Sequence, residues 1–487
     1  MERRQILYPF STIIILKRMI NMSEKTQAEI LKEELFYSPE HAAYACEDEE
    51  IAKADAFCEG YKQFLNACKT EREAAAFVKE LAEKNGYVPF DPKASYKAGD
   101  KVYSDIRSKA LILCTFGSES LEKGAKIVAS HIDSPRLDLK PNPLYEDAEL
   151  ALFKTHYYGG IKKYQWTAIP LALHGIIYRR DGSSVKVCLG EDEGDPQFVV
   201  TDLLPHLDKK QANRPMSEAI EGENLNILVG SRPFAKDKGS EMVKLNIMKL
   251  LNEKYGIIEA DFLSAELEAV PAFKASDIGF DRSMVGSYGH DDRVCAYPSV
   301  MAEIDTVMPK YTSVTVITDK EETGSDGNTG LHSAFLKHFI ADIAKTQGLC
   351  GRDVLRASEC LSADVNAGFD PTYPSVHDKL NAAFINRGIV VTKYTGSRGK
   401  SSTNDANAEF MAKIRTLFDN SKVAWQIGEL GKVDEGGGGT VAKYVANLGV
   451  EVVDVGVPVL SMHAPFEVVA KLDVYMAYKG FKAFLEQ

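Results

Sequence analysis

Residues 125–135 read Ala-Lys-Ile-Val-Ala-Ser-His-Ile-Asp-Ser-Pro, a short apolar run that ends in a histidine and a turn. Such runs, bounded by turn residues, are typical of buried strands. Three later runs, at 314–318, 360–363 and 452–461, also lead into an acid or a histidine followed by a turn. A further polar segment, 288–293, precedes a helix-like stretch. Ligands bind outside the carboxyl ends of strands in open α/β sheets, so these polar ends are predicted to meet in space.

The remaining pattern predicts an α/β fold in two domains. Apolar residues recur with helical spacing through 23–86, and short strand-like runs follow. Residues 134–263 differ, because they combine alternating strand-like runs, an aromatic Gly-rich segment and an acidic loop. Buried strands and helices then return. We therefore expect one α/β domain, residues 22–133 plus 264–487, interrupted by an inserted domain with its own β structure at 134–263.

The composition indicates a soluble globular protein. The 487 residues are 45% hydrophobic and 26% charged, which is ordinary for this class. With 58 Lys and Arg against 70 Asp and Glu, the net charge of −12 argues against nucleic-acid or membrane partners, which select basic faces. Eight scattered cysteines without a CxxC pair predict reduced thiols and a cytoplasmic location.

Residues 1–21 carry an apolar run between charged ends. The run is shorter than the roughly 20 residues that span a bilayer, and no small-residue cleavage site follows it. Met22-Ser23-Glu24-Lys25 has the features of a natural start, so residues 1–21 are interpreted as a non-native extension. A membrane-associating segment is the alternative, and N-terminal sequencing of the native protein distinguishes the two.

The polar strand ends and the segment before the helix offer five metal ligands: His131, Asp291, Glu322, Asp364 and His463. This set has no thiolate, so it suits Zn²⁺, with Mn²⁺ or Co²⁺ as alternatives. Five ligands exceed the three of a usual catalytic zinc site and fit two ions that share a carboxylate. Asp133, two residues after His131 in extended chain, is expected to accept a hydrogen bond from its imidazole. Glu321 offers a further carboxylate that could act as general base.

Each of these residues also has an ordinary explanation when it is taken alone. A single histidine or aspartate at a strand end is usually a turn or capping residue. Adjacent acids such as Glu321 and Glu322 are usually solvated. Only the joint pattern of strand ends and ligand types favours a site for two metal ions.

Five segments resemble the aspartyl aminopeptidase family, co-catalytic metallopeptidases that include vacuolar aminopeptidase I: SHIDSP at 130–135, GHDDR at 289–293, DKEETG at 319–324, SAD at 362–364 and SMHAP at 461–465. The match runs in order from about residue 30 to the C-terminus. The segment HYYGGIKKYQW at 156–166 is similar to the bacterial branch. The resemblance implies a central mixed sheet flanked by helices, of the co-catalytic zinc exopeptidase type, with an inserted β-rich dimerisation domain.

The resemblance also implies a role for each candidate: His131 and Asp364 bind one ion, Glu322 and His463 bind the other, Asp291 bridges both, Glu321 is the general base, and Asp133 lies behind His131. Asp292 takes the place of Asp291 if the second member of the pair is the bridge. Family members dimerise through the inserted domain, and dimers build a dodecamer that encloses the active sites. The same self-association is expected here.

Three further residues are candidates through the resemblance alone. A histidine from the neighbouring subunit is thought to reach each site of the family, and His174 is the candidate by position; an interface or core histidine is the alternative. Lys393 and Tyr394 match a Lys-Tyr stretch near the substrate pocket, although a solvated strand-end lysine explains Lys393 as well. The glycines at 436–439 lack the Lys-Ser/Thr of a phosphate-binding loop, so close approach of the backbone to a peptide or metal explains them better.

The sequence thus predicts a metal-dependent aminopeptidase that removes an acidic or neutral N-terminal residue from peptides through a water activated by two ions. A deacylase or amidohydrolase on the same platform is the first alternative, and a panel of peptide and acyl substrates separates the two. A non-enzymatic shell protein with a vestigial site is the second, which a chelator-sensitive peptidase assay decides. Nucleotide binding at 436–439 would appear as a thermal shift with ATP.

Overall fold

The computed structural model describes residues 25–235 and 238–487, so the predicted extension at residues 1–21 lies outside the described residues. The chain divides into two compact units, Met1–Glu40 and His41–Gln487. In the first unit, α2 (Gln27–Leu35) begins with a capping box, in which the side chains of Thr26 and Glu29 each accept the other's backbone N–H. All other elements of the described residues belong to the second unit.

A nine-stranded mixed sheet forms the centre of the second unit. Its order is β1 (Val88–Pro89), β2 (Lys101–Ile106), β3 (Ala110–Thr115), β14 (Thr312–Thr318), β4 (Ala125–His131), β15 (Glu359–Ser362), β19 (Glu451–Gly456), β17 (Ile389–Thr392) and β18 (Trp425–Ile427). The strands β14, β4, β15 and β19 are parallel neighbours in the middle of the sheet. Every residue of β3, β14 and β4 is buried, as expected for strands that are covered on both faces.

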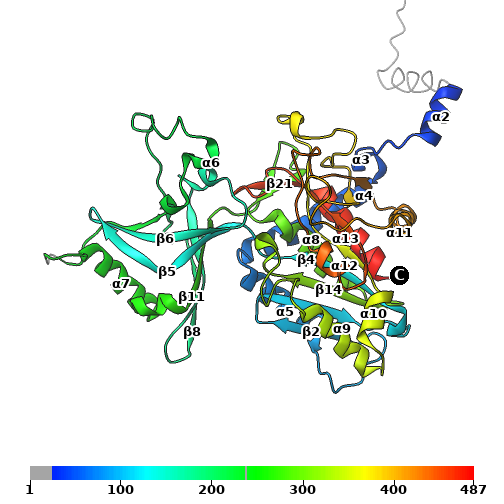
Figure 1. Ribbon diagram of the computed structural model, residues 1–487, viewed down its shortest axis with the longest axis horizontal. Coiled ribbons are helices and arrows are strands. Elements are labelled where there is room, and N and C mark those ends of the chain that lie inside the picture. The colour runs from blue at the N-terminus through cyan, green and yellow to red at the C-terminus, as the bar shows by residue number, and fades with distance from the viewer. Residues whose placement is uncertain (1–24, 236–237) are drawn as a thin grey trace, which may run out of the picture. The chain divides into compact units, whose positions relative to one another are not determined.

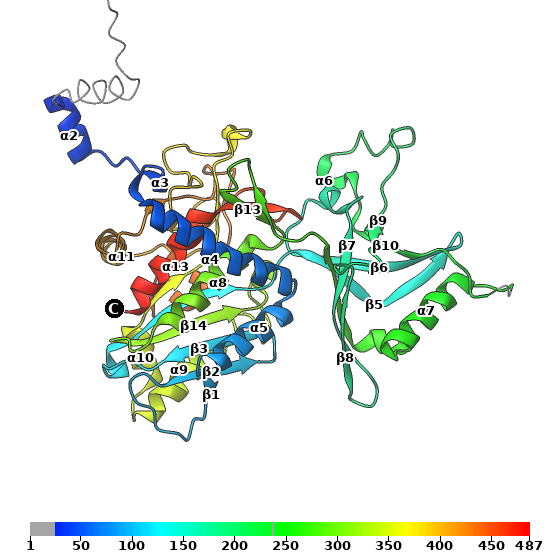
Figure 2. The ribbon, with the colours of Figure 1, turned by 180° about the vertical axis from the view of Figure 1, so that it is seen from behind.

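Helices cover both faces of this sheet: α4 (Asp48–Ala67), α5 (Glu71–Lys84), α8 (His290–Asp305), α11 (Ala408–Asn420) and α13 (Lys471–Leu485) on one, and α9 (Phe335–Thr346), α10 (Gly351–Ala357) and α12 (Ala442–Ala446) on the other. The alternation of β3 shows the division, because Leu111 and Leu113 pack with the first group and Ile112 and Cys114 with the second. Figure 1 shows α9, α10 and α12 in front of the sheet, and Figure 2, from behind, shows α4, α5 and α8 in front of it. The predicted α/β fold with a central mixed sheet is confirmed.

The helical stretch predicted at 23–86 contains four helices, α2, α3 (Ala42–Ala45), α4 and α5. At the start of α5, Thr70 and Glu73 form a capping box, in which they exchange side-chain and backbone hydrogen bonds. The helix ends at Lys84, directly before Asn85 and Gly86, a pair that is typical of a helix C-terminus. Within the described residues, none of the helices combines the length and apolar character that a membrane span requires.

A second, seven-stranded sheet has the order β8 (Ser184–Leu189), β7 (Leu171–Tyr178), β11 (Ala265–Pro271), β5 (Arg136–Asp147), β6 (Leu150–Tyr158), β10 (Ile227–Gly230) and β9 (Val199–Val200). All of its strand pairs are antiparallel. The apolar face packs against α7 (Met242–Tyr255), and a short helix, α6 (Met216–Ala219), lies in the loop before β10. Because β11 pairs with β5 and β7, the second sheet extends past residue 263, where the inserted domain was predicted to end.

Two small sheets complete the second unit: β12 (Ser276–Ile278), β13 (Met284–Ser287) and β21 (Glu467–Ala470) form one, and β16 (Asn366–Ala367) and β20 (Pro458–Val459) form the other. The central strands bring the polar segments together. Thr318 at the end of β14 is the register partner of His131 at the end of β4. On the other side of β4, Ser362 of β15 is the partner of Ala129. The chain segments that follow these three strands therefore leave the sheet at one edge.

Candidate metal centre

Asp291, at the amino end of α8, lies between two histidines that come from distant parts of the chain. Its Oδ1 is 3.2 Å from Nε2 of His131, and its Oδ2 is 3.1 Å from Nε2 of His463. Ligand atoms that surround one zinc ion at its usual bond lengths lie about 3.3 Å apart in a tetrahedral arrangement. The two oxygens of Asp291 are therefore spaced to serve one ion on each side.

Each side of Asp291 has one further carboxylate. Asp364 Oδ1 lies 3.9 Å from Nε2 of His131. Glu322 Oε2 lies 3.6 Å from Nε2 of His463. The side chains form two groups with Asp291 in common, each able to place three ligand atoms within 4.8 Å of one another: His131, Asp291 and Asp364 in one, and Asp291, Glu322 and His463 in the other. The five predicted ligands are thus brought together, in the two groups that the resemblance implied.

The donors of this cluster fit a pair of divalent cations. Oε1 of Glu322 and Oδ2 of Asp364 are buried and have no hydrogen-bond partner. Burial and the neighbouring carboxylates hold the pKa of both side chains well above its usual range. Buried, unpartnered carboxylates are costly unless a charge compensates them. Imidazole and carboxylate donors without a thiolate suit zinc.

Asp133 connects the two halves of the cluster from behind. Its Oδ1 lies 3.2 Å from Nδ1 of His131 and accepts the backbone N–H of Glu321 at 3.2 Å. Its Oδ2 accepts the backbone N–H of Glu322 at 3.2 Å and the hydroxyl of Tyr158 at 2.7 Å. Burial alone would raise the pKa of Asp133, but its interactions with His131 and Tyr158 hold it below its usual value. The backbone carbonyl of Asp133 also lies 3.1 Å from Nδ1 of His131, so Asp133 meets the imidazole through its main chain as well as its carboxylate. Its predicted role in orienting His131 stays a prediction.

Glu321 lies beside the cluster without belonging to either group of ligands. It begins the short 3₁₀ helix Glu321–Thr323, and its Oε2 is 3.9 Å from Nε2 of His131. Burial raises the pKa of Glu321 to about 7. Asp292, the alternative to Asp291, instead accepts the backbone N–H of His131 through Oδ2 at 3.1 Å. Of the two aspartates, it is therefore Asp291 whose carboxylate lies between His131 and His463.

Sequence reasoning missed a buried acid, Glu467 of β21, that binds the backbone of two residues of the cluster. Its Oε1 accepts the backbone N–H of His463 at 2.7 Å, and its Oε2 accepts that of Asp291 at 3.1 Å. The backbone of His463 has a φ of 64°. Residues other than glycine adopt this left-handed conformation uncommonly. A glutamate within the apolar run that follows the SMHAP segment was the available signal.

His174 lies elsewhere, on β7 of the second sheet. It is 2% exposed, and its Nδ1 is 2.8 Å from Oε1 of Glu73. Burial alone would lower the pKa of the imidazole, but its interactions with Cys188 and Glu73 outweigh burial and raise it to about 10. His174, Glu73 and Cys188 form a third group whose possible ligand atoms lie within 4.8 Å of one another. The ammonium of Lys69 is also close, 3.4 Å from Glu191, whose other carboxylate oxygen lies 3.8 Å from Nε2 of His174.

Lys393 and Tyr394 lie beside a cavity of about 220 Å³, whose apolar walls include Val391, Met411 and Ile427. Lys393 forms an ion pair with Asp405. The hydroxyl of Tyr394 donates a hydrogen bond of 2.5 Å to Glu429, which also lines the cavity. Both predicted substrate-binding residues are thus engaged with acids outside the metal-ligand cluster.

The glycines at 436–439 approach the chain's own backbone. A Cβ atom on Gly436 would lie 2.0 Å from the carbonyl oxygen of Leu430, and one on Gly437 would lie 2.5 Å from Cα of Ser397. Packing of loop against loop therefore requires Gly436 and Gly437, whereas a Cβ atom on Gly439 would meet nothing within 4 Å. The expectation that this stretch approaches a bound peptide or metal is not needed to explain the first two glycines.

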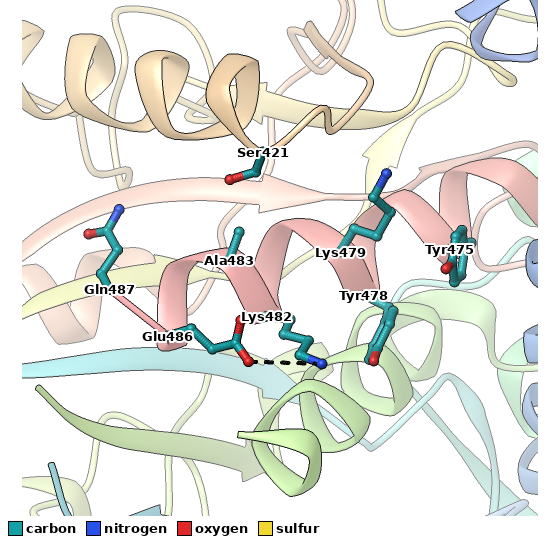
Figure 3. A pocket seen from close by; sticks show the side chains of 8 residues that line it. All are labelled: Ser421, Tyr475, Tyr478, Lys479, Lys482, Ala483, Glu486 and Gln487. Carbon is teal, nitrogen blue, oxygen red and sulfur yellow. Dashed lines mark ion pairs between the residues drawn. The ribbon is translucent and has the colours of Figure 1, made fainter. Parts of the chain in front are cut away.

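An open hollow of about 480 Å³ beside the end of α13 contains none of the predicted site residues (Figure 3). Tyr475, Tyr478 and Lys479 line it, and Lys482 pairs with Glu486 at 3.9 Å across one helical turn. This ion pair is exposed, and exposed pairs of this kind contribute little to stability. The metal-ligand cluster, not this hollow, therefore has the arrangement expected of a reactive centre.

The mixed sheet and the two ligand groups at its edge have the arrangement of a metal-dependent α/β enzyme. Comparison with known proteins specifies the family. Residues 64–485 match the family described as aminopeptidase I zinc metalloprotease (M18). A probable M18 family aminopeptidase 1 of Clostridium acetobutylicum is 51% identical over 450 residues, which are 90% of this chain and 96% of that protein.

Solved structures agree with this similarity. An M18 aminopeptidase crystal structure from Thermotoga maritima superimposes with a TM-score of 0.89 at 42% identity, and the match covers 93% of this chain and 100% of that one. The S. cerevisiae mApe1 dodecamer has the same fold, with a TM-score of 0.72 at 20% identity over 90% of this chain and 97% of that one. The chain belongs to the M18 family of zinc metalloproteases, and the prediction of a metalloaminopeptidase is confirmed.

Proposed function

We propose that this aminopeptidase cleaves the first peptide bond of its substrate at a site that holds two zinc ions. The observation that carries the proposal is the position of Asp291, whose two oxygens lie 3.2 Å from His131 and 3.1 Å from His463. His131 and Asp364 would hold one ion with Asp291, and Glu322 and His463 would hold the other. Asp133 would keep the imidazole of His131 in its ligating orientation.

When bound, such a pair of ions lowers the pKa of a water molecule and polarises the carbonyl that it attacks. Glu321 supports the proton transfers in this proposal, because it lies beside the cluster and outside both ligand groups. Its carboxylate takes the proton of the attacking water and delivers it to the nitrogen of the leaving peptide. The backbone N–H of Glu321, held by Asp133, keeps the carboxylate in position for both transfers.

Exchange of Glu321 for Gln tests this role. The variant should retain the wild-type zinc content and lose at least a hundredfold in kcat, the lower end of the usual contribution of a general base. Glu322→Gln is the matched control one residue away, and it should lose bound zinc. Zinc content by mass spectrometry and kcat on aminoacyl-p-nitroanilides measure the two effects separately. Turnover close to wild type in Glu321→Gln would show that the base is another group.

An N-terminal residue with an acidic or neutral side chain is the proposed substrate, and Lys393 and Tyr394 are its proposed contacts. The cavity beside them has apolar walls, which supports a neutral side chain. The ion pair of Lys393 with Asp405 leaves this lysine less free to select an acidic one. Rates on substrates with N-terminal Asp, Glu, Leu and Ala, compared between wild type and Lys393→Met, decide between the two classes.

Self-association through residues 134–263 and the adjoining β11 is also proposed, in dimers that build a dodecamer. Exposed apolar side chains on these residues support it: Leu203, Leu204, Leu207, Met216, Leu245, Leu250 and Leu263. The S. cerevisiae protein of this fold is described as a dodecamer. Light scattering measures the assembly directly. The free thiols of the described cysteines support a cytoplasmic location.

His174 is proposed to act at the site of a neighbouring subunit, which requires its imidazole to leave Glu73. Co-expression of a His174→Ala chain with a Glu321→Gln chain tests this role. Mixed assemblies should recover activity that neither variant has alone, because some sites then combine an intact Glu321 with an intact partner histidine. Activity no higher than that of the parent variants would show that His174 acts only within its own chain.

A further inference from the structure

The last residue of β6 and the two glycines after it, residues 158–160, connect the second sheet to both ligand groups. The hydroxyl of Tyr158 donates to Oδ2 of Asp133 at 2.7 Å. Two residues later, the carbonyl of Gly160 is 2.7 Å from Nδ1 of His463 and accepts a hydrogen bond from it. We name these three residues the 158–160 segment.

On the first side, Tyr158 acts through Asp133. The hydroxyl completes the set of donors around this carboxylate, which faces the imidazole of His131 and the backbone N–H groups of Glu321 and Glu322. The ring of Tyr158 is fixed by the guanidinium of Arg136, which lies 4.0 Å from the ring centroid. Tyr158 is 8% exposed, so its hydroxyl has little access to water as an alternative partner.

On the second side, the segment fixes the tautomer of His463. With the proton on Nδ1 directed at the carbonyl of Gly160, Nε2 carries the lone pair, and it faces Asp291 and Glu322. Gly159 has a φ of 74°, and a Cβ atom there would lie 3.2 Å from Oε2 of Glu322. The absence of side chains at both glycines therefore lets the backbone pass directly over the second ligand group.

We infer that the 158–160 segment is a positioning element for both halves of the metal centre, supplied by the second sheet. The inference rests on the proposed function, because it assumes that the two ligand groups bind zinc. It adds that zinc affinity depends on residues that touch no metal. Partners of this kind typically change metal affinity or activity by about tenfold to a hundredfold when they are removed.

Tyr158→Phe tests the first contact, because it removes only the hydroxyl. Tyr157→Phe is the matched control, since Tyr157 is the preceding residue and its side chain is 40% exposed. Zinc affinity is measured by competition of the zinc-free full-length proteins with a chromophoric chelator. Tyr158→Phe should bind zinc about tenfold to a hundredfold more weakly, while Tyr157→Phe retains wild-type affinity. In zinc-saturated enzyme, kcat should fall with KM unchanged, because the hydroxyl of Tyr158 is engaged with Asp133 and acts through it.

Gly159→Ala tests the second contact, and it should weaken zinc binding by a similar factor through Glu322. A lower melting temperature of the zinc-free variants with unchanged zinc affinity and kcat would show that the segment is only structural, and would overturn the inference. The proposed function is tested separately, by whether the wild type binds two ions and cleaves peptides. If the wild-type protein itself bound no zinc, the proposed function and the inference would both fall.

Discussion

Glu467 and His463 are joined by a hydrogen bond of 2.7 Å, which the backbone N–H of His463 donates to the glutamate. The second oxygen of the same carboxylate accepts the backbone N–H of Asp291. A single buried side chain on β21 therefore fixes the main chain of two proposed ligands that are far apart in the sequence. Burial raises the pKa of Glu467 to about 8, because water does not reach this carboxyl group to solvate its charge.

Glu467→Gln should destabilise the zinc-free protein. An amide has one acceptor oxygen for the two backbone N–H groups, so one of them loses its partner. A buried donor without a partner costs about 1–3 kcal/mol, and urea unfolding should show a loss of that size. Glu435→Gln, at an exposed position, is the control and should unfold like the wild type. Equal stability of the two variants would mean that the amide finds other partners.

Asp291→Ala should disturb both ions, because Asp291 is common to both ligand groups. Zinc content, measured by mass spectrometry after gel filtration, should fall at both positions, whereas Asp364→Ala should affect mainly the group of His131. Asp342→Ala, at an exposed position of α9, controls for the purification. Retention of two ions in Asp291→Ala would exclude the bridging role.

Removal of zinc should lower the melting temperature as well as the activity. Burial, together with repulsion between the neighbouring carboxylates, raises the pKa values of Glu322 and Asp364, and a bound cation would compensate both effects. A ligand at a hundredfold excess over its Kd stabilises a folded protein by about 2.7 kcal/mol. Thermal unfolding before and after dialysis against a chelator measures the effect. Zinc added back should restore the melting temperature and the activity. An identical melting temperature with and without zinc would contradict the proposal that the cluster binds zinc.

Arg136→Met should be among the most destabilising single changes in the chain. The guanidinium is buried and lies 3.2 Å from Glu71 and 3.3 Å from Glu268, which are both buried as well. Removal of one partner from a buried ion pair costs about 3–5 kcal/mol, because it leaves a buried charge uncompensated. Urea unfolding measures this loss, with the exposed Arg352→Met as control. If Arg136→Met lost no more unfolding free energy than the control, the two glutamates would become protonated at little cost.

The central strands were predictable because burial on both faces gives short apolar runs, and a parallel arrangement brings their carboxyl ends together. The pattern of apolar runs alone is enough to place His131, Glu322 and Asp364 at one edge of the sheet. Residues that support these ligands were not predictable in the same way. Tyr158 and Glu467 lie within strands, and their sequence neighbours give no indication of which distant backbone or carboxylate they meet.

The limits of the second sheet were also hard to predict. The sequence of β11, Ala-Glu-Leu-Glu-Ala-Val-Pro, alternates in a way that suits a strand of either sheet. Only its pairing with β7 and β5 assigns it to the second sheet. His174 was identified through resemblance, and its contact with Glu73 could not be foreseen because the two residues are 101 positions apart.

The pairing of Thr318 with His131 has a consequence for how the chain must fold. A slip of one position between β14 and β4 would displace the loop with Glu321 and Glu322 by about 3.3 Å along the strand. The same slip would turn the side chains of β14 toward the opposite helical layer. Misaligned pairing would therefore expose or misplace the apolar side chains that pack on both faces of the sheet. The burial of these side chains stabilises the correct register, and this register sets the distance between the two acids and His131.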